Sequence, residues 1–130
     1  MGLILDTNFV IAVEREARRG GAGRADAFLA RYPSETFFIT FTVAGELACG
    51  QSANARRDWE ILCRPYPILP WTMEISWHYG ETYRTLASAG SLIGTNDLWI
   101  ASTALAYGHG IVTNNQDEFR RVPGLFVETF

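Results

Sequence analysis

The stretch Leu3-Ile4-Leu5-Asp6-Thr7-Asn8 decides the fold of this 130-residue chain. Its three apolar residues are too few for a helix. Placed between Gly2 and a polar run, they predict a short strand buried on both faces. Apolar residues then recur at helical spacing through residues 9–17. Asp6 is therefore predicted to lie where a buried strand ends and a helix begins, the place where open α/β sheets bind ligands.

Two interpretations of Asp6 follow from that position. Asp, Thr and Asn are preferred at helix N-caps, because their side-chain oxygens accept otherwise unpaired amide hydrogens. A carboxylate at the end of a buried strand can also be a catalytic or ligand-binding group. The positions of the other acidic residues decide whether Asp6 is only a helix cap or also a catalytic or ligand-binding residue.

The composition is that of an ordinary globular domain, and it bears on membrane association and on the charge of possible partners. Of its residues 48% are hydrophobic and 19% are charged, and its length suits one domain over residues 1–130. No apolar stretch approaches the ~20 residues that span a bilayer, and the chain starts directly with its first strand. No membrane association and a cytoplasmic location are therefore expected.

A net charge of −3 does not indicate a polyanion partner. All 11 basic residues are arginine, which pairs well with phosphate, but a GC-rich genome gives the same bias.

The cysteines and histidines do not predict a zinc site. Cys49 and Cys63 are too far apart for a metal knuckle, and both fall in apolar helical patterns, so buried reduced thiols are expected. His78 and His109 show no ligand spacing.

Strand and helix patterns alternate along the rest of the chain. We expect strands at residues 3–5, 36–41, 66–69, 111–113 and 125–128. We expect helices at residues 7–19, 25–31, from the cap Thr42 to about Gly50, 54–64, 72–89 and 95–107 with Thr95 as capping residue, and a polar turn or short helix at 114–121. This alternation predicts an α/β fold: a mostly parallel central sheet of about five strands with helices on both faces.

Such a sheet brings acidic residues from four segments to one edge. Asp6 follows the first strand, and Glu46 lies in the first turns of the helix after the second strand. Asp97 begins the helix that runs back to the start of the fourth strand, while Asp117 and Glu118 follow that strand. Each acid alone has a plain explanation as a helix-terminal or turn residue. A shared edge for five of the 14 acidic residues is not explained that way.

Clustered carboxylates repel one another and raise one another's pKa values. A hard divalent cation relieves this repulsion, and Mg²⁺ or Mn²⁺ prefers oxygen ligands and keeps several waters. One such ion can lower the pKa of a bound water and polarise a phosphoryl oxygen. Two ions about 3.5–4 Å apart can clamp the attacking and leaving oxygens of a displacement. The acids therefore point to metal-assisted phosphoryl chemistry.

Four motifs, in order along the whole chain, carry a resemblance to a known family. They are Leu-Asp-Thr-Asn at 5–8, Gly-Glu-Leu at 45–47, Asn-Asp-Leu-Trp-Ile-Ala-Ser at 96–102 and Val-Thr-Asn-Asn-Gln-Asp-Glu-Phe-Arg-Arg-Val-Pro-Gly-Leu at 112–125. Together they resemble a PIN domain, and more narrowly the VapC ribonuclease toxins of prokaryotic toxin–antitoxin pairs. The resemblance implies a PIN-like fold and a Mg²⁺- or Mn²⁺-dependent endoribonuclease that hydrolyses RNA phosphodiesters.

The resemblance also implies roles for individual residues. Asp6, Glu46 and Asp97 would be the catalytic acids that bind the metal ion. The family often has a fourth acid two residues after the threonine of the last motif, where this chain has Asn115. An acid also commonly precedes the phenylalanine, and Glu118 is therefore expected to complete the catalytic set. The polar groups expected to support these acids or position substrate are Thr7, Asn96, Thr113, Asn115 and Asp117.

Partners follow from the same resemblance, and two alternatives stay open. The family implies an RNA substrate held by nearby arginines, a homodimer, and a cognate antitoxin bound to the aromatic-rich surface near the acids. Core packing is nevertheless the commoner role for aromatic residues such as Tyr79 and Tyr83. A structure-specific DNA nuclease on the same scaffold is one alternative, and a non-catalytic RNA- or protein-binding module is another. An aspartyl-nucleophile phosphatase would need a second Asp at the position of Asn8.

Overall fold

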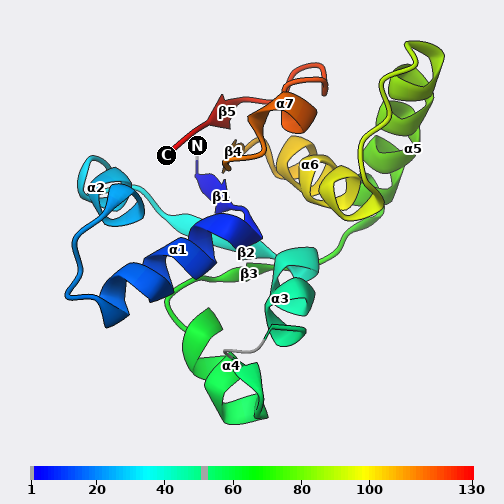
Figure 1. Cartoon of the computed structure of the whole chain (residues 1–130). Helices are drawn as coiled ribbons and strands as arrows, with labels where there is room; N and C mark the ends of the chain where they lie inside the picture. The colour runs from blue at the N-terminus through cyan, green and yellow to red at the C-terminus, as the bar shows by residue number, and fades with distance from the viewer. Residues whose placement is uncertain (1, 51–52) are drawn as a thin grey trace.

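The computed structural model describes residues 2–50 and 53–130, and a parallel sheet lies at its centre (Figure 1). Within these residues five strands pair in the order β3-β2-β1-β4-β5, and every pair is parallel. The strands are β1 (Leu3–Leu5), β2 (Phe37–Thr40), β3 (Ile68–Leu69), β4 (Gly110–Val112) and β5 (Val127–Glu128). The predicted α/β architecture is confirmed.

Helices connect the strands and cover both faces of the sheet. In the described part of the chain they are α1 (Thr7–Arg18), α2 (Arg24–Ala30), α3 (Phe41–Ala48), α4 (Arg56–Cys63), α5 (Met73–Ser88), α6 (Thr95–Tyr107) and α7 (Gln116–Phe119). Helix α5 packs against α6 and stands at the outside of the molecule, on the right of Figure 1. None of these helices is long and apolar enough to cross a membrane.

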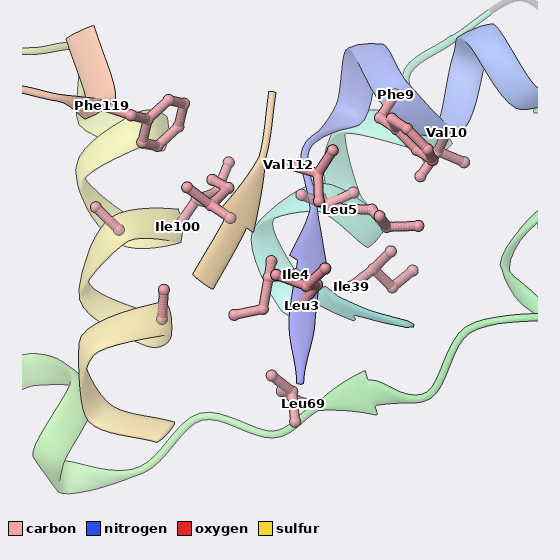
Figure 2. Close-up of a cluster of buried hydrophobic side chains, with 14 of the residues drawn as sticks. Leu3, Ile4, Leu5, Phe9, Val10, Ile39, Leu69, Ile100, Val112 and Phe119 are labelled. Atoms are coloured by element: carbon pink, nitrogen blue, oxygen red, sulfur yellow. The ribbon is translucent and has the colours of Figure 1, made fainter. Parts of the chain in front are cut away.

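The central strand β1 is the middle of the hydrophobic core. It is paired on both edges, with Leu3 opposite Phe37 on one side and Gly110 on the other, and all three of its residues are buried. Phe9 approaches the strand from α1, whereas Ile100 projects from α6 toward β4 (Figure 2). Burial on both faces explains why β1 is a continuous apolar run rather than an alternating one.

Helix α3 begins without a loop directly after β2, and this corrects one expectation. The hydroxyl of Thr40 accepts a hydrogen bond from the backbone N–H of Val43 at 3.0 Å, so Thr40 is the N-cap. The prediction of Thr42 as cap was wrong, because the helix starts at Phe41 and takes Thr42 into its first turn. Thr95 is likewise the first residue of α6 and not its cap, which is Gly94 and provides no side-chain bond.

The two cysteines differ in environment. Cys63 is buried, as predicted, and burial raises the pKa of its thiol. Cys49 is exposed, contrary to the prediction. The reason is its position as C-cap of α3, beyond the turn whose Leu47 packs into the core.

Candidate active site

The parallel sheet delivers four carboxylates to the edge formed by the carboxyl ends of its strands. Asp6 follows β1, Glu46 lies on α3 after β2, Asp97 is in the first turn of α6, and Glu118 is on α7 after β4. The negative charges of Asp6, Glu118 and Glu46 all raise the pKa of Asp97. Four acids separated by up to 112 positions in sequence therefore share one electrostatic environment.

Asp6 is both a helix cap and a member of this cluster. Its side chain is the N-cap of α1, with Oδ1 accepting the backbone N–H of Thr7 at 2.8 Å. Its other oxygen accepts the hydroxyl of Thr113 at 2.6 Å. Only 5% of the residue is exposed, and this burial raises the pKa of its carboxyl despite the two hydrogen bonds. Capping is therefore real, and it accounts for one of the two carboxylate oxygens.

Glu46 is held by two side chains from different elements. The hydroxyl of Thr7 donates to Oε1 at 2.7 Å, and the amide of Asn96 donates to Oε2 at 3.4 Å. Thr7 thus joins α1 to α3, and Asn96 joins α6 to α3. Both residues lie where the sequence placed supporting polar groups.

Asn115 lies between Asp97 and Glu118. Its Nδ2 donates to Oδ2 of Asp97 and to Oε2 of Glu118, each at 3.0 Å. Burial, followed by the hydrogen bond with Glu118, raises the pKa of Asp97 to about 7. Hydrogen bonds from Asp97 and Asn115 lower the pKa of Glu118. Of these two carboxyls, Asp97 is therefore the one whose protonated form the surroundings favour.

The two adjacent acids of α7 are in different environments. Glu118 is in the hydrogen-bonded cluster, whereas Asp117 is exposed, and no hydrogen bond between described residues joins Asp117 to the cluster. Sequence reasoning missed a contribution from Asn8, whose amide donates to Oδ2 of Asp6 at 3.4 Å. Its position two residues after Asp6, in the first turn of α1, is the signal that could have identified it.

The donor set suits a hard divalent cation by its chemistry, although not by its present geometry. Each carboxylate accepts hydrogen bonds from hydroxyls or amides, and the three ion pairs within residues 2–50 and 53–130 lie elsewhere: Arg18–Glu14, Arg56–Glu60 and His78–Glu81. Carboxylate oxygens without a cationic partner are the ligands that Mg²⁺ and Mn²⁺ prefer. In the same residues no three His, Cys, Asp or Glu side chains stand, as they lie, in an arrangement that would hold a metal ion.

Aromatic residues of α3, α5 and α6 contact one another. Trp99 of α6 stacks on Tyr79 at 4.0 Å between ring centroids and meets Phe41 edge-on at 6.2 Å. Tyr79 packs against the core, whereas 47% of Tyr83 is exposed. The core interpretation therefore suits Tyr79 and is wrong for Tyr83.

Comparison with known sequences gives a family for this arrangement. Residues 3–125 match the family model of the PIN domain. Ribonuclease VapC1 of Haemophilus influenzae strain R2866 is 32% identical over 127 residues, which cover 94% of this chain and 92% of that protein. Ribonuclease VapC2 of Rickettsia felis is 33% identical over 102 residues, covering 75% of this chain and 76% of that protein.

Solved structures give the same result for the backbone. VapBC2 from Rickettsia felis, bound to a DNA fragment from its promoter, matches with a TM-score of 0.81 and 26% identity, covering 100% of this chain and 99% of that one. VapBC-1 from nontypeable Haemophilus influenzae matches with a TM-score of 0.77 and 29% identity, covering 99% of this chain and 98% of that one. A PIN-domain match over nearly the whole chain, with similar ribonucleases at both the sequence and the structural level, assigns this chain to the PIN-domain family and, within it, to the VapC ribonuclease toxins.

Proposed function

We propose that this toxin is a Mg²⁺- or Mn²⁺-dependent endoribonuclease that hydrolyses RNA phosphodiesters in the cytosol. One observation carries the proposal: four carboxylates from four segments meet at the ligand-binding edge of the sheet and are hydrogen-bonded only by uncharged donors or by one another. Gathering like charges without a cation costs free energy. A bound divalent cation would offset this repulsion and would allow a phosphate group to bind beside the carboxylates.

Asp6, Glu46 and Asp97 are the residues that would hold the ion. When bound, such an ion supplies an activated water and neutralises charge on the phosphate. Donors from Thr7, Asn96 and Thr113 orient the carboxylates, as hydrogen-bond partners of metal ligands do.

Two further residues serve the substrate in this proposal. Glu118 is the remaining carboxylate of the cluster, and we assign it to the proton transfer that accompanies cleavage. Arg121, whose charge helps to lower the pKa of Glu118, is tied to the carbonyl of Leu92 at 3.1 Å. Its exposed guanidinium is placed to contact an RNA phosphate.

The proposal is tested with purified protein and end-labelled RNA. We expect cleavage in Mg²⁺ or Mn²⁺, none in EDTA, and recovery when excess cation is added back. Asp97→Asn removes a ligand charge at nearly constant shape and should reduce cleavage at least 100-fold, on the order of the loss caused by removing one electrostatic group at a catalytic centre. Asp117→Asn is the matched control, because it removes the same charge from an exposed neighbour of the site.

The same assay separates the alternatives. A DNA nuclease would cleave single-stranded or structured DNA in preference to RNA under the same conditions. A non-catalytic module would bind RNA and leave it intact at every cation concentration. Either result would overturn the proposed activity while leaving the family assignment unchanged.

We propose a cognate antitoxin as the protein partner. The proposal is supported by the similar solved structures, which are VapBC assemblies from Rickettsia felis and Haemophilus influenzae. Expressed alone, the chain should arrest growth. Co-expressed with the product of the neighbouring open reading frame, it should copurify with that product, and growth should resume. Copurification without recovery of growth would contradict inhibition by that partner.

We also propose a homodimer, and helix α5 supports it. Its outer face exposes 76% of Met73 and 59% of Trp77. Gly80 follows on the same face, and a Cβ added there would meet only the Arg84 guanidinium at 3.6 Å. No contact within residues 2–50 and 53–130 requires this glycine, which costs a helix about 1 kcal/mol relative to alanine. A second copy of α5 crossing at Gly80 would use the gap and cover the apolar face.

A further inference from the structure

We propose that Tyr83 is a base-stacking residue of the RNA site, whose exposed ring holds an unpaired base of the substrate beside the carboxylate cluster. This inference rests on the proposed function. It adds to that function the part of the RNA that is recognised, a base free of Watson–Crick pairing, and the residue that contacts it. Proteins that bind single-stranded RNA commonly stack its bases on aromatic side chains.

Tyr83 combines an exposed, uncommitted ring with a place on the side of the acids. The large aromatic side chains exposed in the described part of the chain are Trp71, Trp77, Tyr83 and Phe126. The indole N–H of Trp71 donates to a serine hydroxyl at 3.0 Å. The guanidinium of Arg84 lies 5.6 Å from the ring centroid of Trp77. Phe126 precedes β5 and therefore lies at the opposite edge of the sheet. Tyr83 is 47% exposed, and no hydrogen bond or ring contact among residues 2–50 and 53–130 involves it.

The packing of α5 on α6 places Tyr83 toward the carboxylate cluster. Tyr79 of α5 stacks on Trp99 of α6 at 4.0 Å between ring centroids. Tyr83 follows Tyr79 by four residues, so it lies on the same flank of α5, one turn nearer to the end of that helix. Asn96, which belongs to the site, precedes Trp99 by three residues and lies one turn nearer to the start of α6. Both steps lead in the same direction, because residues 89–94 connect the end of α5 to the start of α6.

The connection between these two helices is itself fixed to the acids. The backbone N–H of Gly94 donates to the carboxylate of Glu118 and helps to lower its pKa. The guanidinium of Arg121 donates to the carbonyl of Leu92 at 3.1 Å. The end of α5 that carries Tyr83 is therefore held beside the carboxylate cluster.

The charge of the site explains why a stacked base is needed. Clustered carboxylates repel the phosphates of RNA, and the chain as a whole has a net charge of −3. Counterion release, which supplies the affinity of basic proteins for nucleic acids, is therefore weak here. Stacking on an aromatic ring requires no positive charge and accepts every base, because each base has a π-face. A ring beside the acids thus provides affinity where electrostatic attraction is small.

The first measurement is the affinity for a fluorescent oligoadenylate of about ten nucleotides, a length within the site sizes of proteins that bind single strands. Fluorescence anisotropy is measured on the whole chain in EDTA, where no cleavage is expected and no ion takes part. We expect Tyr83→Ala to raise the Kd about tenfold, within the range for the loss of one base–aromatic stack. Tyr83→Phe keeps the ring and should retain the wild-type Kd. Phe126→Ala is the matched control, because it removes an exposed ring from the opposite edge of the sheet and should leave the Kd unchanged.

An abasic oligomer of the same length separates stacking from charge. It carries the same phosphates without bases, so the wild type and Tyr83→Ala should bind it equally. The slope of log Kd against log salt should also be the same for both proteins, because that slope counts neutralised phosphates. In the cleavage assay, Tyr83→Ala should raise the KM for RNA and leave kcat nearly unchanged.

Four results would overturn the inference. Circular dichroism verifies folding, and Tyr83→Leu replaces Tyr83→Ala if alanine is not tolerated. The first result is a folded variant without the ring that binds oligoadenylate as the wild type does. The second is an equal loss of affinity for the abasic oligomer, and the third is a wild type with no measurable affinity for oligoadenylate. The fourth is an unchanged Kd together with lost copurification of the neighbouring gene product, which would assign Tyr83 to the antitoxin interface.

Failure of the proposed function would be recognised separately. A wild type that binds oligoadenylate through Tyr83 but cleaves no RNA in Mg²⁺ or Mn²⁺ supports the base-stacking role and refutes the proposed activity. A wild type that cleaves RNA with the same KM and the same Kd for oligoadenylate as Tyr83→Ala refutes the base-stacking role and leaves the activity in place.

Discussion

At the scale of single residues, the two oxygens of Asp6 face different demands. Oδ1 caps α1, a task that asparagine performs equally well. Oδ2 must accept from the hydroxyl of Thr113, which itself accepts from the backbone of Asn115. An amide NH₂ group cannot accept that bond. N-cap preference alone therefore underestimates how strongly this position requires a carboxylate.

Substitution of Asp6 by asparagine should reveal both demands. We expect Asp6→Asn to abolish RNA cleavage and relieve growth arrest, and to lower the free energy of unfolding by about 1 kcal/mol through the lost bond to Thr113. Cleavage, growth and urea denaturation are the measurements. A folded variant that cleaves at the parental rate would show that Asp6 is a cap alone.

The adjacent acids of α7 allow a matched pair of substitutions. Glu118→Gln removes a carboxylate that is hydrogen-bonded to Asn115 and interacts with Asp97, whereas Asp117→Asn removes an exposed one outside the described network. We expect the first to slow cleavage at least tenfold and the second to change it less than twofold, consistent with the 10²–10⁴-fold contribution of a proton-transfer group. The reverse order would assign the proton-transfer role to Asp117.

The raised pKa of Asp97 makes a prediction for the metal-free protein. The folded chain keeps a proton on Asp97 up to about pH 7, whereas the unfolded chain loses it near pH 3.8. Its contribution to stability is complete below pH 3.8 and is lost as the pH rises to about 7. The measurement is the free energy of unfolding of the wild type and of Asp97→Asn, both in EDTA. The difference, wild type minus variant, should fall as the pH rises from 3.8 to about 7. If the free energies of unfolding of the two proteins changed in parallel with pH, this would contradict the raised pKa of Asp97.

Much of the site was predictable because it follows from topology. A parallel sheet places every strand-to-helix junction at one edge, which brings Asp6 and Glu46 together. A helix that returns to the start of a strand begins at the same edge, and α6 brings Asp97 there. The tie from Asn115 to Asp97 and Glu118 could not, because it depends on a four-residue helix and on side-chain directions that periodicity does not encode.

At the scale of elements, boundaries were less predictable than the elements themselves. Thr40 and Thr42 are both suitable caps by residue type, and only the pairing of Thr40 with Leu69 in the sheet determines where β2 ends and α3 begins. The same limit applies to Cys49, which helical periodicity places on a buried face and the end of α3 leaves exposed.

Helix α5 provides the prediction at this scale. Gly80→Leu would fill the gap on its outer face, and Trp77→Ala would remove a large exposed anchor. Because the exposed face makes few contacts within the chain, both variants should stay folded and sediment as monomers while the wild type sediments as a dimer. Phe126→Ala, half exposed on another surface, is the control. A wild type that is monomeric at micromolar concentration would contradict the homodimer.

At the scale of the whole molecule, a cation should couple the site to global stability. Its ligands come from the ends of β1, α3 and α6, so it would bind the folded chain and not the unfolded one. At 100 times its Kd it should add about 2.7 kcal/mol to the free energy of unfolding. Mn²⁺ should therefore raise the Tm by several degrees, and Asp97→Asn should lose most of the rise. An equal rise in both proteins would place the ion elsewhere.

The central position of β1 has a consequence during synthesis. Its hydrogen-bonding partner β4 lies more than 100 residues later, and Thr113, which fixes Asp6, follows β4 directly. A nascent chain that has exposed only its first hundred residues therefore holds Asp6 and Glu46 without the strand and the hydroxyl that assemble them. We therefore expect chains truncated before Gly110, as released from damaged messages, to cleave no RNA, because they lack the strand and the hydroxyl that position Asp6.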